Sequence, residues 1–160
     1  KLTIDGEEVQ LTDEQWRMLG IIEKEKRPFK RTYYGCNYFC ISSFGDVDSY
    51  CDYNDCTADA YFKAVNYFST QPFANQVALH QLLYRKLLKF SYENKCADVE
   101  WNGSNDHWCI YYNPDDLNYC VAGFGSHKFD GVWFSSEEGA ERAIKEVVEP
   151  FMKEHPEFVW

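Results

Sequence analysis

Side chains that could bind a metal ion or act in catalysis are concentrated in one short segment of the chain. The segment CISSFGDVDSYCDYNDC runs from Cys40 to Cys56 and contains three cysteines and four aspartates. With Cys36 it offers four thiols, and structural zinc sites use four Cys or His ligands in a tetrahedron. The spacing of Cys36, Cys40, Cys51 and Cys56 is not that of a compact zinc knuckle. A zinc site is therefore the less favoured interpretation of this segment.

Calcium binding and catalysis have less support in the sequence. Asp46 and Asp48 begin a calcium-type D-x-D pattern, but Cys51 stands at the Gly position of such a loop. The final Glu position of the loop holds Thr57. The four histidines form no HExxH motif, and no GxSxG, P-loop or dinucleotide-binding glycine motif occurs. We therefore predict a protein that is not an enzyme and that uses no metal ion or cofactor.

The net charge of −10 comes from two acidic segments. Residues 33–62 and residues 96–127 contain five acids each and no Lys or Arg. The acids are Asp46, Asp48, Asp52, Asp55 and Asp59 in the first segment, and Asp98, Glu100, Asp106, Asp115 and Asp116 in the second. Nucleic-acid binding requires a basic footprint, and the basic run KEKRPFKR is a short linker. We predict no direct binding to nucleic acid.

Tyrosines alternate with these acids. Aspartates are common in turns, so the acids alone do not establish a function. Aromatic side chains supply much of the binding energy at interfaces, and charge steers the encounter with a partner of opposite sign. We predict that a basic protein partner binds an acidic, aromatic surface. Its residues are Asp46, Asp48, Tyr50, Asp52, Tyr53, Asp55, Tyr111, Tyr112, Asp115, Asp116 and Tyr119.

The two acidic segments share a residue pattern that indicates an internal duplication. FCI at 39–41 matches WCI at 108–110, SYC at 49–51 matches NYC at 118–120, and NYFST at 66–70 matches VWFSS at 132–136. Cys40 and Cys51 have the same spacing as Cys109 and Cys120. A hairpin turn midway would place the two members of each pair opposite one another. Each copy predicts two strands, a polar turn, a third strand ending in Phe-Ser, and a helix.

Helix and hairpin signals complete the predicted fold. The first copy ends in a helix over about residues 71–92, and the second in a helix that begins at Ser135 or Ser136. In front of both copies, residues 2–4 and 9–11 flank an Asp-Gly turn as a hairpin, and residues 12–26 form a helix. The prediction is an α+β protein: an N-terminal β-hairpin plus helix, then two tandem antiparallel meander-plus-helix repeats. The units are residues 1–30, 31–94 and 95–160.

The overall composition indicates a globular domain. A chain of 160 residues buries roughly 70% of its unfolded surface on folding, so it has no need of disulfides for stability. No apolar run approaches the roughly 20 residues of a membrane span, and the first residues lack the apolar stretch of a signal peptide. We expect a cytoplasmic protein with free thiols, for which a homo-oligomer is compatible with the sequence.

Several of these motifs resemble small uncharacterised proteins of phages and prophages of Gram-positive gut bacteria. They are YFCISSFGDVDSYCDYND with NYFST, repeated as HWCIYYNPDD with VWFSSEEGAERAI, and the resemblance covers residues 31–151. It implies a phage gene expressed in the host cytoplasm, with a counter-defence role such as inhibition of a CRISPR nuclease. The chain departs from the family pattern at Pro72-Phe73 and at Gly139. The family brings no agreed catalytic residues to carry over.

Three functions remain open at this point. The first is a phage-encoded inhibitor that binds a bacterial defence protein through acidic aromatic hairpin surfaces. The second is a protein that sequesters a nucleotide-like signal between aromatic side chains. The third is a virion or assembly protein.

Overall fold

The computed structural model describes residues 2–4, 7–9, 27–98, 100–101 and 105–160. The elements, in chain order, are β1 (Leu2–Ile4), β2 (Glu7–Val9), β3 (Asn37–Ile41), β4 (Val47–Cys51), α2 (Cys56–Lys63), α3 (Gln71–Glu93), β5 (His107–Asn113), β6 (Asn118–Phe124), α4 (Glu137–Ala143), the π-helical turn η1 (Ile144–Val148) and α5 (Glu149–Glu154). The predicted α+β class is confirmed. From residue 27 onward the chain forms two units that each combine a β-hairpin with helices.

The N-terminal hairpin is present with a different second strand. Strand β1 pairs with β2 in the register Leu2 opposite Val9. The second strand therefore begins at Glu7 rather than at Val9, and residues 10–11 of the predicted strand lie outside the described residues. The predicted helix over residues 12–26 lies outside the described residues.

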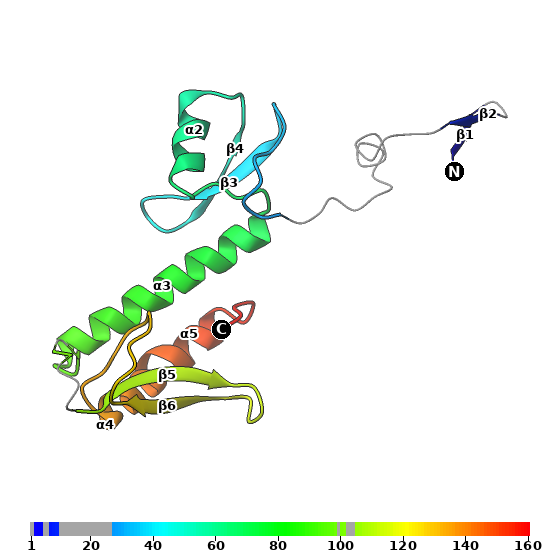
Figure 1. Ribbon diagram of the computed structural model, residues 1–160. Coiled ribbons are helices and arrows are strands. Elements are labelled where there is room, and N and C mark those ends of the chain that lie inside the picture. Colours follow the sequence, from blue (N-terminus) through cyan, green and yellow to red (C-terminus); the bar gives the residue numbers. More distant parts are fainter. Residues whose placement is uncertain (1, 5–6, 10–26, 99, 102–104) are drawn as a thin grey trace.

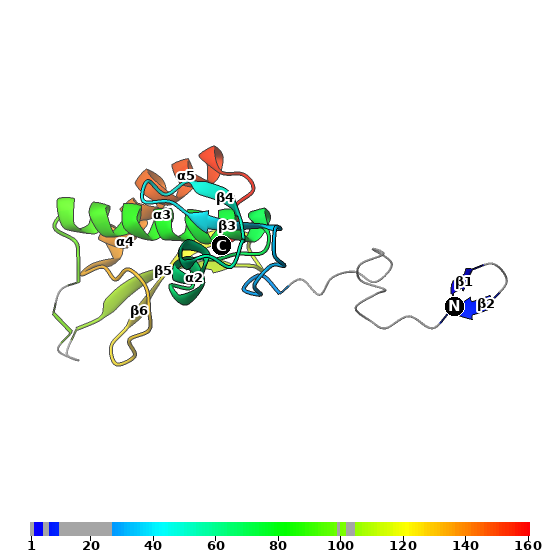
Figure 2. The same ribbon diagram turned by 90° about the horizontal axis from the view of Figure 1, so that it is seen from above.

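The two units are stacked in layers (Figure 1). From one side of the molecule to the other, the layers are α2, the β3–β4 hairpin, α3, the α4–α5 helices and the β5–β6 hairpin. The view from above shows the β3–β4 hairpin lying over α3 (Figure 2). Helix α3 and the C-terminal helices therefore lie between the two hairpins, and α2 lies on the outer side of the β3–β4 hairpin.

In the first unit, the β3–β4 hairpin has a helix on each face. Successive side chains of a strand point to opposite faces. On one face Ile41 packs in a cluster with Ala74 and Ala78 of α3. On the other face Cys40 packs in a cluster with Ala58 of α2. Strand β3 therefore packs against a helix on each face, whereas strand β4 is more exposed.

Helix α2 is absent from the sequence-based prediction. Its N-cap is Asp55, whose carboxylate accepts hydrogen bonds of 2.9 Å from the backbone amides of Thr57 and Ala58. Asp59 lies in its first turn and Lys63 in its last turn, and both charges are favourable beside the helix dipole. Two acids of the first acidic segment therefore lie at the start of a helix that the sequence-based prediction does not contain.

The internal duplication is visible in the backbone hydrogen bonds. Phe39 and Phe68 exchange both of their N–H···O=C bonds at 2.8 Å. Trp108 and Phe134, at the matching positions of the second copy, do the same at 3.0 and 2.8 Å. The predicted third strand of each copy is thus reduced to an isolated bridge beside the hairpin.

The register of the first hairpin differs from the prediction. Cys40 lies opposite Asp48, and Cys51 lies opposite Asn37. The prediction that Cys40 faces Cys51 is therefore wrong. The last pair before the turn is Ile41 with Val47, so the turn is not centred between the two cysteines.

The second hairpin is longer, and its cysteines also do not face one another. Cys109 lies opposite Ala122, and Cys120 lies opposite Tyr111. The strands have seven residues each, against five in β3 and β4. The extra residues lie on the turn side, so the matching SYC and NYC motifs do not occupy equivalent places in the two ladders.

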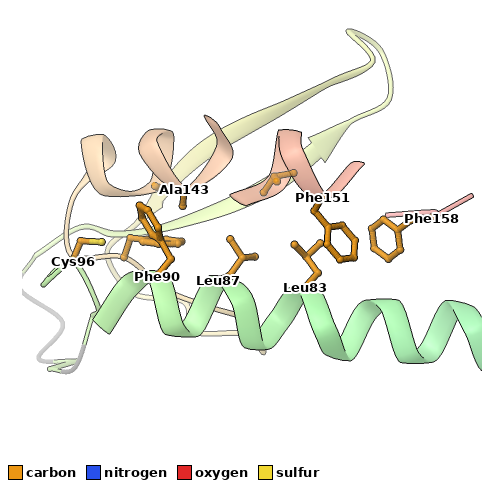
Figure 3. Close-up of a cluster of buried hydrophobic side chains, with 10 residues drawn as sticks. Leu83, Leu87, Phe90, Cys96, Ala143, Phe151 and Phe158 are labelled. Carbon is orange, nitrogen blue, oxygen red and sulfur yellow. The ribbon is translucent and has the colours of Figure 1, made fainter. Parts of the chain in front are cut away.

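Helix α3 contributes side chains to both units. Its first half carries Ala74 and Ala78 to the β3–β4 hairpin. Its second half carries Leu83, Leu87 and Phe90 into a cluster with side chains from the C-terminal helices. Figure 3 shows these three side chains pointing toward Ala143, Phe151 and Phe158. The helix predicted for the first repeat is thus a central element that the two units share.

The C-terminal helix has three parts. Ser136, rather than Ser135, is the N-cap, and its hydroxyl accepts a 3.1 Å hydrogen bond from the Gly139 amide. Gly139 packs so closely against Cys96 that an added Cβ atom would lie 2.8 Å from the Cys96 Cβ. The π-helical turn η1 ends directly before Glu149-Pro150, and proline has no N–H to donate to the preceding turn.

Candidate functional site

The structure places Asp52 inside the first unit, not on the predicted acidic surface. Its side chain is 0% exposed. Arg31 binds it through two hydrogen bonds, from Nε to Oδ2 at 2.7 Å and from Nη2 to Oδ1 at 3.0 Å. The Tyr67 hydroxyl donates to Oδ2 at 2.8 Å, and the Asn54 amide donates to Oδ1 at 2.7 Å. The prediction that Asp52 contacts a partner is wrong, because every direction around its carboxylate is occupied by the protein.

Arg31 also binds Asp59, so two of the five acids of the first segment share one internal cation. Its hydrogen bonds hold the pKa of Asp52 at about 2, below the usual range of a carboxyl group. Arg31 precedes the segment in sequence, which is why the charge count of residues 33–62 does not include it. The buried end of this network is the Tyr67 ring, which stacks on Tyr38 with centroids 4.3 Å apart.

The remaining predicted residues of the first unit lie at the surface along strand β4 and its two ends. We call them the β4 surface: Asp46, Asp48, Tyr50, Tyr53 and Asp55. Asp48 is half-buried, and the other four are exposed, with Tyr50 at 47% and Tyr53 at 56%. Among the described strands β4 pairs only with β3, so no described strand binds the backbone groups of its outer edge.

Two of these side chains contact one another on β4. The Tyr50 hydroxyl donates to Asp48 Oδ2 at 3.4 Å, and the Asp48 charge raises the pKa of Tyr50. Tyr53 packs edge-on against Tyr34, with centroids 5.6 Å apart. Asp55 remains exposed although it caps α2. The β4 surface therefore presents carboxylates beside tyrosine rings that are held in place by neighbours.

The second hairpin brings fewer of its predicted residues to the surface. Tyr111, Asp115 and Asp116 are exposed. Tyr112 and Tyr119 are half-buried and pack together, with centroids 5.3 Å apart. Tyr119 also packs against Trp160, and Asp116 accepts a 2.7 Å hydrogen bond from the Asn113 side chain. This end of the hairpin is partly occupied by internal contacts.

The two hairpin turns do not form one joined surface. They point to opposite ends of the molecule, with the β3–β4 turn at the left and the β5–β6 turn at the right of Figure 1. The acids at the turn of the first hairpin and those at the turn of the second therefore belong to two separate sites. A single partner surface of ordinary size would contact one of them.

The four cysteines of the possible zinc site are not gathered. Cys36 and Cys56 are exposed, whereas Cys40 is buried. Within the described residues no three His, Cys, Asp or Glu side chains are placed to share a metal ion. Burial raises the pKa of Cys40, and the same cause acts on Cys96 and Cys109, so these cysteines stay protonated and poorly nucleophilic.

His107 occupies the place in the second unit that Tyr38 occupies in the first. It is 2% exposed, its Nδ1 atom is hydrogen-bonded to Asp98, and its ring stacks on Trp101 with centroids 3.6 Å apart. Lys128 Nζ lies 5.4 Å from the centroid of the Trp101 ring. The Nε2 atom of His107 is buried without a hydrogen-bond partner among the described residues. A buried Nε2 atom is not open to a substrate, so this arrangement is one of packing.

The fold and surface together define an α+β protein of two hairpin–helix units with an acidic, aromatic strand edge. Comparisons with protein-family models, curated proteins and solved structures give no match to this chain. No helix among the described residues is both long and apolar enough to span a bilayer.

Proposed function

We propose that this chain is a non-enzymatic binding protein that uses the β4 surface to bind a basic surface of a bacterial protein. One observation carries the proposal. Arg31 is the internal cation that binds Asp52 and Asp59. The three acids of the β4 surface form no ion pair among the described residues, and residues 33–62 contain no Lys or Arg. A basic partner would supply the missing counter-charges.

Strand geometry supports the same proposal. Tyr50 and Tyr53 provide exposed ring area beside these acids, and tyrosine is enriched among residues that dominate binding energy. The open edge of β4 offers backbone N–H and C=O groups to the same partner. The raised pKa values of the buried thiols support a binding protein over a cysteine-based enzyme.

The phage resemblance extends the proposal to a class of partner. A counter-defence inhibitor would bind a bacterial defence protein, and a nuclease such as a CRISPR effector has a basic surface for nucleic acid. Carboxylates on the β4 surface would bind the basic groups of the nuclease in place of nucleic-acid phosphates. The chain would then act in the cytoplasm of the bacterial host.

The test is capture of host proteins on the immobilised chain, followed by binding measurements on the captured protein. The test variant is D46N/D48N/D55N, which removes three charges but keeps the cap of α2, because asparagine is as good an N-cap residue as aspartate. The matched control is D115N/D116N on the other hairpin. We expect the first variant to lose at least tenfold in affinity and the control to lose much less. Equal affinity of the wild type and the first variant would exclude the β4 surface.

A further inference from the structure

A groove of about 870 Å³ lies between the β3–β4 turn, the segment that follows α2, and the middle of α3. Its volume is within the range of about 300–1,000 Å³ that is typical of small-molecule sites. None of the side chains of the β4 surface lines it. The apolar side chains that line it include Phe29, Ile41, Phe44, Val65, Phe68 and Leu82.

The rim of the groove exposes an unusual amount of apolar surface. Phe44 is 92% exposed, Val65 is 64% exposed and Phe29 is 48% exposed. The floor is closed by Phe68, which is 1% exposed. Apolar side chains that are grouped at one place on a surface mark a binding site more often than scattered ones do. Two of the three rim side chains are phenyl rings, which favour a flat aromatic ligand.

The groove has one cation. Arg85 is the one charged side chain among the described residues that line it, and it is exposed. Its Nη2 atom lies beside the turn, 3.5 Å from where a Cβ atom on Gly45 would be. Lys86 and Lys89 on the same helix pair with Glu154 and Glu93, respectively, whereas Arg85 forms no ion pair within the described residues.

Polar groups beside Arg85 could complete an anion site. Ser43 and Gln81 line the same groove, and both can donate hydrogen bonds. A guanidinium group binds carboxylate, sulfonate and phosphate oxygens through charge-assisted hydrogen bonds. In a chain of net charge −10, a cation without an internal partner at a groove is a specific anchor for an anion.

Val65, on the rim of the groove, has an unusual backbone conformation. Its φ angle is +56°, a left-handed conformation that is strained for a β-branched residue. The backbone forms a Schellman motif at the end of α2, with hydrogen bonds from Val65 to Phe62 and from Asn66 to Tyr61. Glycine is the usual residue at this place. A strained valine there provides a side chain at the groove rim at a cost in stability.

We propose that the groove binds a small aromatic anion, whose ring packs on the phenyl rims and whose acidic group binds Arg85. The ligand needs a flat ring that carries one carboxylate, sulfonate or phosphate group. A nucleotide and an aromatic carboxylate both satisfy it. The site is separate from the β4 surface, so its failure and the failure of the proposed partner binding are distinguishable.

The test uses 1-anilinonaphthalene-8-sulfonate, a fluorescent aromatic sulfonate, titrated into the full chain. Cooperative thermal unfolding in the same buffer ensures that the native state binds it, because partly folded states also bind this dye. We expect saturable binding at one site. Arg85→Gln should weaken it about tenfold or more, since the charge-assisted hydrogen bonds of the guanidinium group are lost. Lys86→Gln, the matched control one residue along α3, should leave it unchanged.

A second variant separates binding from folding. Val65→Gly should raise the unfolding temperature and lower the affinity for the dye, two changes that a purely structural role would not produce together. Competition by AMP would identify a nucleotide-like ligand, and competition by benzoate alone would identify an aromatic carboxylate. Unsaturable binding, equal affinity in Arg85→Gln, or displacement of the dye by neither competitor would overturn the proposal.

Discussion

The carboxylate of Asp52 lies 2.7 Å from Nε of Arg31 through Oδ2 and 3.0 Å from Nη2 through Oδ1. This pair joins the segment before β3 to the end of β4, and it fixes the charge that the first unit presents. Because Asp52 and Asp59 both bind Arg31, the acids of residues 33–62 that have no internal ion pair are those of the β4 surface. Asp52 therefore contributes to the stability of the fold and not to the binding of a partner.

Asp52→Asn should therefore destabilise the protein. The substitution keeps the size of the side chain but removes the charge that Arg31 and the Tyr67 hydroxyl bind. We expect the free energy of unfolding to fall by about 3 kcal/mol, the lower end of the loss for one partner of a buried ion pair. Urea unfolding measures it. Asp46→Asn, on an exposed side chain, should change stability by less than about 0.5 kcal/mol, and equal effects of the two variants would contradict the assignment.

The Arg31–Asp52 pair also predicts how stability depends on acid. The pKa of Asp52 is lowered to about 2 in the folded state, against about 3.9 for an unfolded aspartate. A lowered pKa gives stability that is present above the unfolded value and is lost as the pH falls through the folded one. We expect the stability difference between wild type and Asp52→Asn to shrink between about pH 4 and about pH 2. A difference that stays constant over that range, measured by urea unfolding, would disprove the linkage.

Val65→Gly should stabilise the chain. Glycine relieves a left-handed conformation that costs a residue with a Cβ atom roughly 1–2 kcal/mol, and part of that gain is offset by the greater freedom of glycine in the unfolded state. We expect a net gain of about 0.5–1 kcal/mol in thermal or urea unfolding. The matched control is Ala64→Gly. Ala64 has a φ angle of −76°, so it has no left-handed backbone strain that glycine could relieve. Its stability should fall, and a rise in both variants would contradict the explanation.

The general architecture is predictable from sequence because the repeated motifs and the helix signals agree. Phe39 and Phe68 in the first copy and Trp108 and Phe134 in the second make the same backbone bridge, as the repeated FCI/WCI and FST/FSS motifs indicate. Hydrophobic periodicity and the serine cap locate α3 and α4 for the same reason. These features depend on patterns of residues that lie close together in the sequence.

Three features are not predictable in this way. Helix α2 has only eight residues, so its apolar pattern is too short to separate it from a loop. The registers depend on turn positions, and one matching tripeptide can occupy different places in two ladders. The burial of Asp52 depends on Arg31, which lies outside the acidic segment. A lone Arg just before that segment is the sequence signal that could have indicated an internal ion pair.

The shared helix α3 predicts that the two units unfold together. Four of the five tryptophans lie in residues 101–160, so tryptophan fluorescence reports mainly on the second unit. Ile41→Ala, in the core of the first unit, should cost about 2–5 kcal/mol and lower the midpoint of the fluorescence transition as well as that of circular dichroism. Phe44→Ala, on an exposed residue, serves as control. Two separate transitions would contradict a shared α3.

The central claim is that the β4 surface binds a basic partner through its charge. The most direct measurement is the dissociation constant of the captured partner over salt concentrations from about 50 to about 300 mM, for wild type and for D46N/D48N/D55N. Screening weakens exposed charge pairs as salt rises, so wild-type binding should weaken steeply. The variant should bind at least tenfold more weakly at low salt and depend far less on salt. Identical dissociation constants and identical salt dependence in the two proteins would contradict the account.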